Sequence, residues 1–139
     1  MPGYRPRVLF VSDHDSGAAR ICAAYLELVA GDRYEPLAAS LEPGEGLSSE
    51  ASTALREDGV TAVEGPGLAM TADLAEIVDR IVTLGFTLNP EVAREVPREE
   101  WGIPGLAGRP LAEVRVIRDT IRRLVEKLVA RLDTEAAVR

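Results

Sequence analysis

Five residues with polar or small side chains follow the first apolar run of the chain: Asp13, His14, Asp15, Ser16 and Gly17. The two carboxylates and the imidazole supply oxygen and nitrogen donors, which could bind a divalent cation or act as a base and an acid. A commoner role for such residues is helix capping, with Asp15 or Ser16 as the N-cap and Asp13 near the positive end of the helix. We give capping more weight than metal binding and expect no cofactor.

The elements around these five residues have the pattern of a βαβ unit. Residues 7–12, Arg-Val-Leu-Phe-Val-Ser, are mostly apolar, as is typical of a strand buried on both faces of a parallel sheet. Apolar side chains then recur at helical spacing from Ala18 to Val29, and Gly31 follows as a stop signal. The five residues therefore join the carboxyl end of a buried strand to the amino end of a helix.

The rest of the chain predicts an α/β sandwich with a mainly parallel sheet. Strands are expected at residues 34–39, 60–63 and 77–84, and short helices at residues 48–58 and 72–75. Residues 85–108 hold three prolines and little periodicity, so they predict a loop. A long helix follows, with Pro110 in its first turn and a tail that we expect to fray from Asp133. All 139 residues fit one domain.

Composition limits the classes of function. The chain has 16 basic and 23 acidic residues, and the formal net charge of -7 argues against a nucleic-acid or anionic-membrane partner. No apolar run is long enough to span a bilayer and the N-terminus lacks a signal-peptide pattern, so we expect a cytoplasmic protein. The single cysteine, Cys22, excludes an internal disulfide and a multi-cysteine metal site.

Several short segments follow one another in an order and spacing that a known family shares. The first runs from Val8 to Ala18. The others are Gly31-Asp32-Arg33-Tyr34-Glu35, Ala38-Ala39-Ser40, Ala72-Asp73-Leu74, Ile81-Val82-Thr83-Leu84-Gly85, Trp101-Gly102-Ile103-Pro104 and Arg118-Asp119-Thr120-Ile121-Arg122-Arg123-Leu124. Together they resemble the superfamily of low-molecular-weight tyrosine phosphatases and arsenate reductases. The resemblance implies a three-layer α/β sandwich with a four-stranded parallel sheet.

The same resemblance implies where the catalytic groups of the family would lie. In that family a cysteine thiolate attacks phosphorus, an arginine clamps the phosphate oxygens, and an acid protonates the leaving group. These positions fall on Ser12, Ala18 and Gly105, so all three catalytic side chains are absent. The asparagine that shapes the phosphate loop of the family falls on Asp15.

Ser12 is a poor substitute for a thiolate, because a serine hydroxyl needs a neighbouring base. Asp13 and Asp15 would repel a phosphate, and His14 could act as the base only if its ring turned towards Ser12. A shifted register that pairs His14 with Arg20 breaks the ungapped match that follows. We therefore interpret Arg20 as a solvated residue of the first helix.

Thiol-relay arsenate reduction needs further cysteines after the last strand, and residues 85–97 contain none. Cys22 lies on the inward stripe of the first helix, which predicts an inert structural thiol. Trp101 is expected to pack the loop that carries Gly105. The arginines of the last helix are expected to form a solvated face.

We predict a catalytically inactive phosphatase-like domain that binds a small ligand or a protein partner at the altered loop from Ser12 to Gly17. The alternative is an enzyme with changed chemistry, a phosphatase or another hydrolase, that uses Asp13, His14 and Asp15 with or without a metal. Their Asp-x-Asp pattern also resembles haloacid-dehalogenase-type phosphatases, but that family needs a longer chain and a different lysine from Lys127. A structural role in a homodimer is a third hypothesis.

Overall fold

The fold was analysed in a computed structural model that describes residues 4–14, 17–42, 44, 46–62 and 68–138. Five strands form one sheet in the order β3-β2-β1-β4-β5, and every neighbouring pair is parallel. The strands are β1 (Arg7–His14), β2 (Glu35–Glu42), β3 (Leu68–Ala69), β4 (Arg80–Leu84) and β5 (Arg98–Trp101). The helices are α1 (Ala18–Ala30), α2 (Ser49–Glu57), α3 (Ala72–Glu76) and α4 (Leu111–Ala137).

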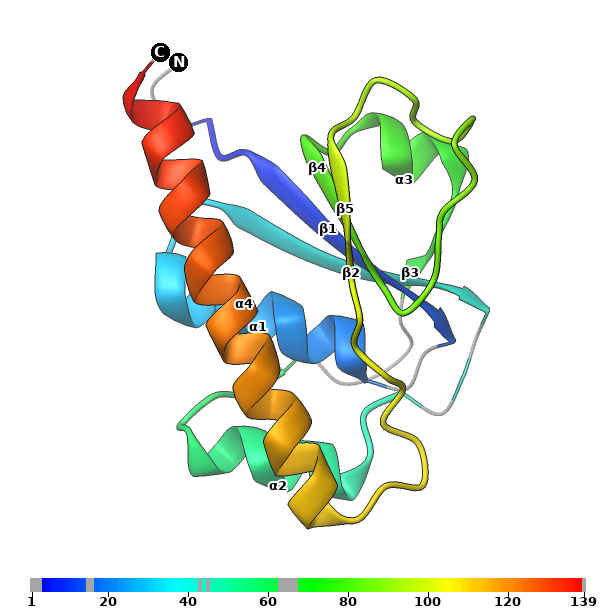
Figure 1. Cartoon of the computed structure of the whole chain (residues 1–139), viewed down its shortest axis with the longest axis vertical. Helices are drawn as coiled ribbons and strands as arrows, with labels where there is room; N and C mark the ends of the chain where they lie inside the picture. Colours follow the sequence, from blue (N-terminus) through cyan, green and yellow to red (C-terminus); the bar gives the residue numbers. More distant parts are fainter. Residues whose placement is uncertain (1–3, 15–16, 43, 45, 63–67, 139) are drawn as a thin grey trace.

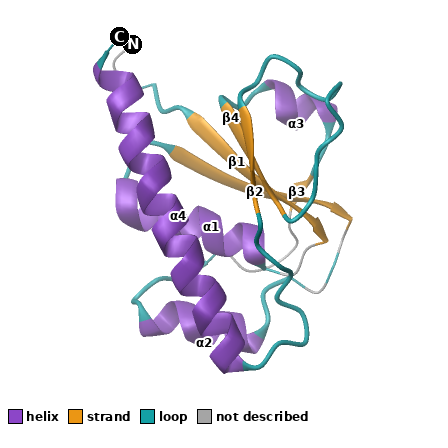
Figure 2. Cartoon of the chain, in the orientation of Figure 1, coloured by secondary structure: helices purple, strands orange, loops and turns teal. Residues whose placement is uncertain are grey.

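The helices cover the sheet from both sides, as Figures 1 and 2 show. α1 and α4 lie on one face, with α2 against α4, and α3 lies on the other face with the segment between β4 and β5. The predicted three-layer α/β sandwich is therefore confirmed. No helix of the described residues is both long enough and apolar enough to cross a membrane.

β1 is central because its side chains are apolar on both faces. Successive side chains of a strand point to opposite faces, so Val8 and Phe10 enter the core under α1 and α4. Leu9 and Val11 enter the smaller core under α3. All four are at most 1% exposed, as the apolar run predicts for a strand with parallel neighbours on each side.

The predicted end of α1 and the predicted starts of α2 and α3 agree with the structure. Gly31 ends α1 with a positive φ of 63°, a conformation that glycine adopts without steric cost. The Ser48 hydroxyl accepts a hydrogen bond from the amide of Ala51 at the start of α2. Thr71 caps α3 in the same way. Local capping chemistry therefore determined these helix ends.

The sheet differs from the prediction in having five strands instead of four. The added strand is β5, which lies within residues 85–108, where we predicted a loop. Its sequence, Arg-Glu-Glu-Trp, has little apolar character because β5 lies at the edge of the sheet and is only partly buried. Pairing with β4 in the tertiary structure creates β5. The spacing of apolar residues in this segment gave no sign of a strand.

Two other strand predictions were wrong in position. Residues 60–62 form no strand and residue 63 lies outside the described residues; the edge strand β3 is Leu68–Ala69. β4 begins at Arg80 and not at Ile77, because Ile77 ends α3 and is 55% exposed. Short apolar runs do not distinguish a strand from a helix end or a packed loop.

The predicted fraying from Asp133 was also wrong, since α4 continues to Ala137. Asp133 accepts a hydrogen bond from the Tyr34 hydroxyl at 2.7 Å and pairs with Arg33 at 2.7 Å. Glu135 pairs with Arg80 at 3.0 Å. These long-range contacts hold the last turns of α4 against the start of β2 and β4.

Candidate functional site

The three positions where the resemblance places catalytic groups lie around one edge of the sheet. Ser12 is near the carboxyl end of β1 and pairs in register with Ser40 of β2 and Leu84 of β4. Ala18 is the first residue of α1. Leu84 in turn pairs with Trp101 of β5, which leads into the segment that carries Gly105. The tertiary structure therefore brings these segments together as the resemblance implies.

β1 continues past Ser12, although we predicted a polar loop from Asp13. Asp13 and His14 belong to the strand, and His14 pairs in register with Glu42 of β2. The backbone amide of His14 donates a hydrogen bond to the Asp13 carboxylate at 2.9 Å. In a phosphate loop such amides point at the anion. Here the carboxylate of the protein itself accepts the hydrogen bond.

The His14 ring pairs with Glu42 and is not placed to act as a base for Ser12. Its Nδ1 lies 3.2 Å from Glu42 Oε2, and both side chains are more than 60% exposed. Ser12, by contrast, is only 4% exposed. The imidazole therefore pairs with a carboxylate at the solvent-exposed rim, which removes the arrangement that a serine nucleophile requires.

The metal hypothesis is weakened by the strand geometry. Adjacent residues of a strand point to opposite faces, so Asp13 and His14 cannot both turn towards one ion. Among the described residues, no three His, Cys, Asp or Glu side chains are grouped so that they could hold a metal. Asp15 and Ser16 lie outside the described residues, so the complete set of predicted ligands is not described.

The N-cap of α1 is Gly17, and the first turn of this helix contains no acidic residue. Asp15 and Ser16, which we predicted to cap the helix, lie outside the described residues, so their capping role stays a prediction. Gly17 has a φ of +97°, and a Cβ atom there would lie 3.1 Å from Leu47 Cδ1. Glycine is needed because the backbone turns sharply into the helix while Leu47 packs directly over it.

Two buried hydroxyl groups lie on neighbouring strands at this edge of the sheet. Ser12 and its register partner Ser40 are 4% and 6% exposed. The first amides of a helix have no acceptor within the helix, and the helix dipole makes this end positive. The start of α1 therefore lies beside an edge to which Asp13 and Glu42 add negative charge.

The segment after β5 retains its packing but has no acid. Trp101 is 5% exposed and packs against Phe10 of β1, with ring centroids 5.7 Å apart, so it is a core residue. Its packing against the loop that carries Gly105 stays a prediction. Ile103 approaches Gly85 so closely that a Cβ atom at Gly85 would lie 2.8 Å from the Ile103 carbonyl oxygen. Residues 102–112 contain no aspartate or glutamate. The carbonyl of Gly105 accepts a hydrogen bond from Arg109 at 2.6 Å.

The two other side chains considered for chemistry are both buried. Cys22 is fully buried, as predicted for a structural thiol, and burial raises the pKa of the thiol. Arg20 is only 8% exposed, so our interpretation of a solvated residue is wrong. Arg20 lies on the side of α1 that faces β2. Ala18, which occupies the position of the family arginine, is 2% exposed and belongs to the main core.

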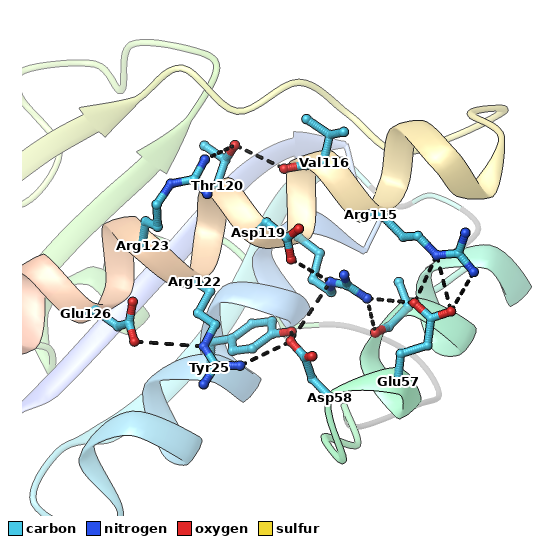
Figure 3. A network of polar contacts seen from close by, with 12 residues as sticks. Tyr25, Glu57, Asp58, Arg115, Val116, Asp119, Thr120, Arg122, Arg123 and Glu126 are labelled. Atoms are coloured by element: carbon cyan, nitrogen blue, oxygen red, sulfur yellow. Dashed lines mark hydrogen bonds and ion pairs between the residues drawn. The ribbon is translucent and has the colours of Figure 1, made fainter.

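A polar network between α1, α2 and α4 was not predicted (Figure 3). The Tyr25 hydroxyl donates to Asp58 at 2.5 Å, and Arg122 lies 3.3 Å from the same carboxylate. Arg118 reaches Glu57 at 2.7 Å, and Arg115 reaches it at 2.6 Å. Hydrogen bonds from these two arginines hold the pKa of Glu57 at about 2.

The prediction that the arginines of the last helix form a solvated face is wrong for Arg118, whereas Arg115 and Arg123 are exposed as predicted. The side chain of Arg118 is only 11% exposed, and it also donates to the carbonyl of Ala54 at 2.9 Å. The signal was present in the sequence, since Arg115, Arg118 and Arg122 share one helix face. Their acidic partners, however, lie on α2, which only the fold places beside them.

Comparisons with known proteins agree with this geometry. No family model matches the chain. Arsenate reductase 1 of Staphylococcus epidermidis is 23% identical over 128 residues, which are 90% of this chain and 96% of that protein. The crystal structure of an arsenate reductase from Archaeoglobus fulgidus is 25% identical, with a TM-score of 0.73 over 88% of this chain and 98% of that one.

A phosphatase structure has the same fold. It is the YwlE arginine phosphatase, a cysteine-to-serine mutant with a phosphorylated active-site serine, with a TM-score of 0.76. The two chains are 16% identical, and the match covers 96% of this chain and 99% of that one.

Proposed function

We propose that this chain, which belongs to one superfamily with the arsenate reductases and low-molecular-weight tyrosine phosphatases, is a single non-catalytic domain. It binds a small ligand or a protein partner at the altered loop from Ser12 to Gly17. The observation that carries this proposal is the joint replacement at Ser12, Ala18 and Gly105, three positions whose segments meet at one sheet edge. Loss of any one such group typically costs orders of magnitude in rate.

Electrostatics at the loop also favour binding without turnover. Asp13 accepts a hydrogen bond from the His14 amide, and Glu42 pairs with the His14 ring. These carboxylates disfavour the approach of a dianionic phosphate ester and the formation of a serine alkoxide. The first amides of α1 have no acceptor within the helix, and such donors suit a neutral or weakly charged acceptor group of a ligand or partner.

The decisive experiment tests for turnover at Ser12. We expect the purified chain to hydrolyse an aryl phosphate no faster than the Ser12→Ala variant does. Intact-mass measurement after incubation adds a second readout, because the active-site serine of the YwlE mutant is phosphorylated. Hydrolysis that is lost in Ser12→Ala, or a phosphoryl group retained on Ser12, would overturn the proposal.

The alternative function, a hydrolase that uses Asp13, His14 and Asp15, is tested separately. Calorimetric titrations with Mg²⁺, Mn²⁺ and Zn²⁺ would detect a metal-dependent form. Binding that disappears in Asp13→Asn and in Asp15→Asn would favour this enzyme over the non-catalytic domain. Absence of heat with all three ions would count against its metal-dependent form.

The proposal extends to the setting of the protein. We propose a cytoplasmic protein that contacts neither nucleic acid nor membrane, because the net charge of -7 opposes both polyanionic surfaces. A homodimer is the third hypothesis. Sedimentation of the isolated chain tests it. If variants of the altered loop dimerise as well as the unchanged chain does, the dimer interface lies away from that loop.

A further inference from the structure

β5 forms one edge of the sheet, and some of its backbone groups point away from the sheet. Within the described part of the chain, β4 is the only strand that pairs with β5. The carbonyl oxygen of Pro97 accepts a hydrogen bond from the amide of Ile81 in β4 at 3.0 Å. Successive residues of a strand direct these groups to alternate sides. The amide and carbonyl groups of Arg98 and Glu100 therefore point outward, away from β4.

The surrounding elements hold β5 on its two faces. On one face, Glu99 pairs with Arg131 of α4 at 3.0 Å. On the other face, Arg98 donates a hydrogen bond to the carbonyl of Ala93 at 2.6 Å. Figure 1 shows α4 and the segment after β4 on either side of β5. Residues 68–138 are described without a gap, and within the described residues no hydrogen bond reaches the outward backbone groups of β5. Such an unpaired edge is a template for another strand.

The side chains of β5 carry a charge pattern that complements itself. Arg98 and Glu100 are two residues apart in the strand, so their side chains point to the same face of the sheet. When two β5 strands pair antiparallel about a twofold axis at Glu99, Arg98 of each copy lies opposite Glu100 of the other. Cross-strand pairs of opposite charge stabilise a sheet. A second copy of this chain is therefore the partner that the charges fit.

The same charges select one register of this pairing. A shift by one residue sets outward groups opposite inward ones and removes the hydrogen bonds. A shift by two sets Glu100 opposite Glu100 or Arg98 opposite Arg98, and like charges directly opposite destabilise a sheet. In the favoured register Glu99 lies opposite itself. Its carboxylate is accompanied within each chain by Arg131 at 3.0 Å and Arg80 at 3.6 Å, which offset the like charge.

We infer that β5 is the interface of a symmetric homodimer, in which two copies pair their β5 strands antiparallel about Glu99 and join their sheets. The outward amides and carbonyls of Arg98 and Glu100 then exchange hydrogen bonds with those of the second copy. Because β5 has only four residues, the interface is small and the association is weak. β5 contributes no residue to the altered loop, so the inference does not depend on ligand binding there.

The first test needs no variant. Amide hydrogen exchange of the full chain is followed by NMR at about 0.05 mM and about 1 mM, with sedimentation over the same range. We expect a dimer at the higher concentration, with exchange of the Arg98 and Glu100 amides slowed several-fold. The Glu99 amide points towards β4 and should exchange slowly at both concentrations. A monomer at about 1 mM would overturn the inference, as would slow exchange of the two outward amides in a chain that sediments as a monomer.

Glu100→Arg tests the charge pattern. It sets cations opposite each other in both cross-strand pairs, so the dimer should dissociate about tenfold more readily. Glu76→Arg makes the same change of charge at an exposed residue of α3 and is the matched control. Equal association of the two variants would contradict pairing through β5.

Glu99→Cys tests the register. Residues directly opposite in a pair without hydrogen bonds have Cα atoms about 4.5 Å apart, which a disulfide can bridge. Oxidation should therefore link two copies of this variant. Glu100→Cys is the control and should link poorly, because Arg98 and not Glu100 lies opposite it. Cys22 is fully buried and does not compete. Equal linking of both variants, or none with Glu99→Cys, would overturn the register.

Discussion

Asp13 shows how a single side chain can change the use of a loop. Its carboxylate accepts a hydrogen bond from the backbone amide of His14. In a phosphate-binding loop, such an amide would point at the bound anion instead. His14 in turn pairs with Glu42 at the exposed rim. The Asp13 carboxylate next to Ser12 works against an anionic ligand.

Asp13→Asn is expected to raise the affinity for inorganic phosphate about three- to tenfold. The amide oxygen of asparagine can still accept from the His14 amide, so only the repulsive charge is removed. Calorimetry or phosphate-dependent NMR shifts measure the change. Glu50→Gln, on the surface of α2, removes one charge as a control and should change the affinity little. Equal effects of both variants would contradict a specific role for Asp13.

Gly17 is the residue whose conformation the loop depends on most directly. We expect Gly17→Ala to lower the free energy of unfolding by about 2 kcal/mol, because φ is +97° and the added Cβ meets Leu47 at 3.1 Å. Gly59→Ala has a similar positive φ of +70° but open space around the Cβ, so about 1 kcal/mol is expected. Urea denaturation measures both. Equal losses would show that contact with Leu47 contributes nothing.

At the level of helices, the network around Glu57 and Asp58 fixes α2 against α1 and α4 (Figure 3). This position matters for the site because the residue before the Ser48 cap, Leu47, packs over Gly17. Arg118 is the central member, since it contacts the Glu57 carboxylate and the Ala54 carbonyl on α2. The altered loop and the network are thus coupled through α2.

Arg118→Ala is expected to reduce the free energy of unfolding by about 1–3 kcal/mol, because it leaves acceptors on α2 without their charged donor. Arg123→Ala is the matched control on the same helix. Arg123 is exposed and, within the described part of the chain, donates a hydrogen bond only to Thr120, at 3.4 Å, so the expected change is near zero. Thermal or urea unfolding distinguishes the two. Similar losses would show that the network adds no stability.

For the molecule as a whole, the same network predicts a dependence of stability on pH. The pKa of Glu57 is lowered from 4.5 to about 2 in the folded chain, so the unfolded chain binds its proton first as pH falls. The contribution of Glu57 to stability is therefore full above about pH 5 and is lost as pH decreases through 4.5 towards 2.

Glu57→Gln should flatten this dependence between about pH 5 and 2 while leaving it unchanged at higher pH. The measurement is urea unfolding at a series of pH values. Glu126→Gln is a suitable control, because Glu126 lies on the surface of α4 and pairs with Arg122 only at 3.8 Å. If both variants lose stability between about pH 5 and 2 as steeply as the unchanged chain does, Glu57 does not cause the loss of stability at low pH.

The end of α4 gives a second prediction for the whole molecule. Removal of residues 133–139 should lower the stability, because Asp133 and Glu135 tie α4 to Tyr34 and Arg80. Burial and the hydrogen bond to Asp133 raise the pKa of Tyr34 to about 12. In the shortened chain we therefore expect Tyr34 to titrate at lower pH, which ultraviolet absorbance detects. An unchanged titration would show that this end contact does not form.

The sequence by itself determined those features that depend on neighbouring residues. Helix periodicity and the caps at Ser48 and Thr71 determined where α2 and α3 begin. The apolar run of β1 determined a central parallel strand. The sequence also determined that Ser12, Ala18 and Gly105 lack a thiol, a guanidinium and a carboxyl group, because side-chain identity requires no fold.

Only the tertiary structure decided the features that depend on partners distant along the chain. β5 exists because β4 pairs with it, and β1 extends to His14 because Glu42 lies opposite. Arg20 is buried because β2 lies beside α1, and the arginines of α4 are engaged because α2 lies within reach. A sequence records which groups can pair, but the energy of pairing is gained only when folding brings them within contact distance.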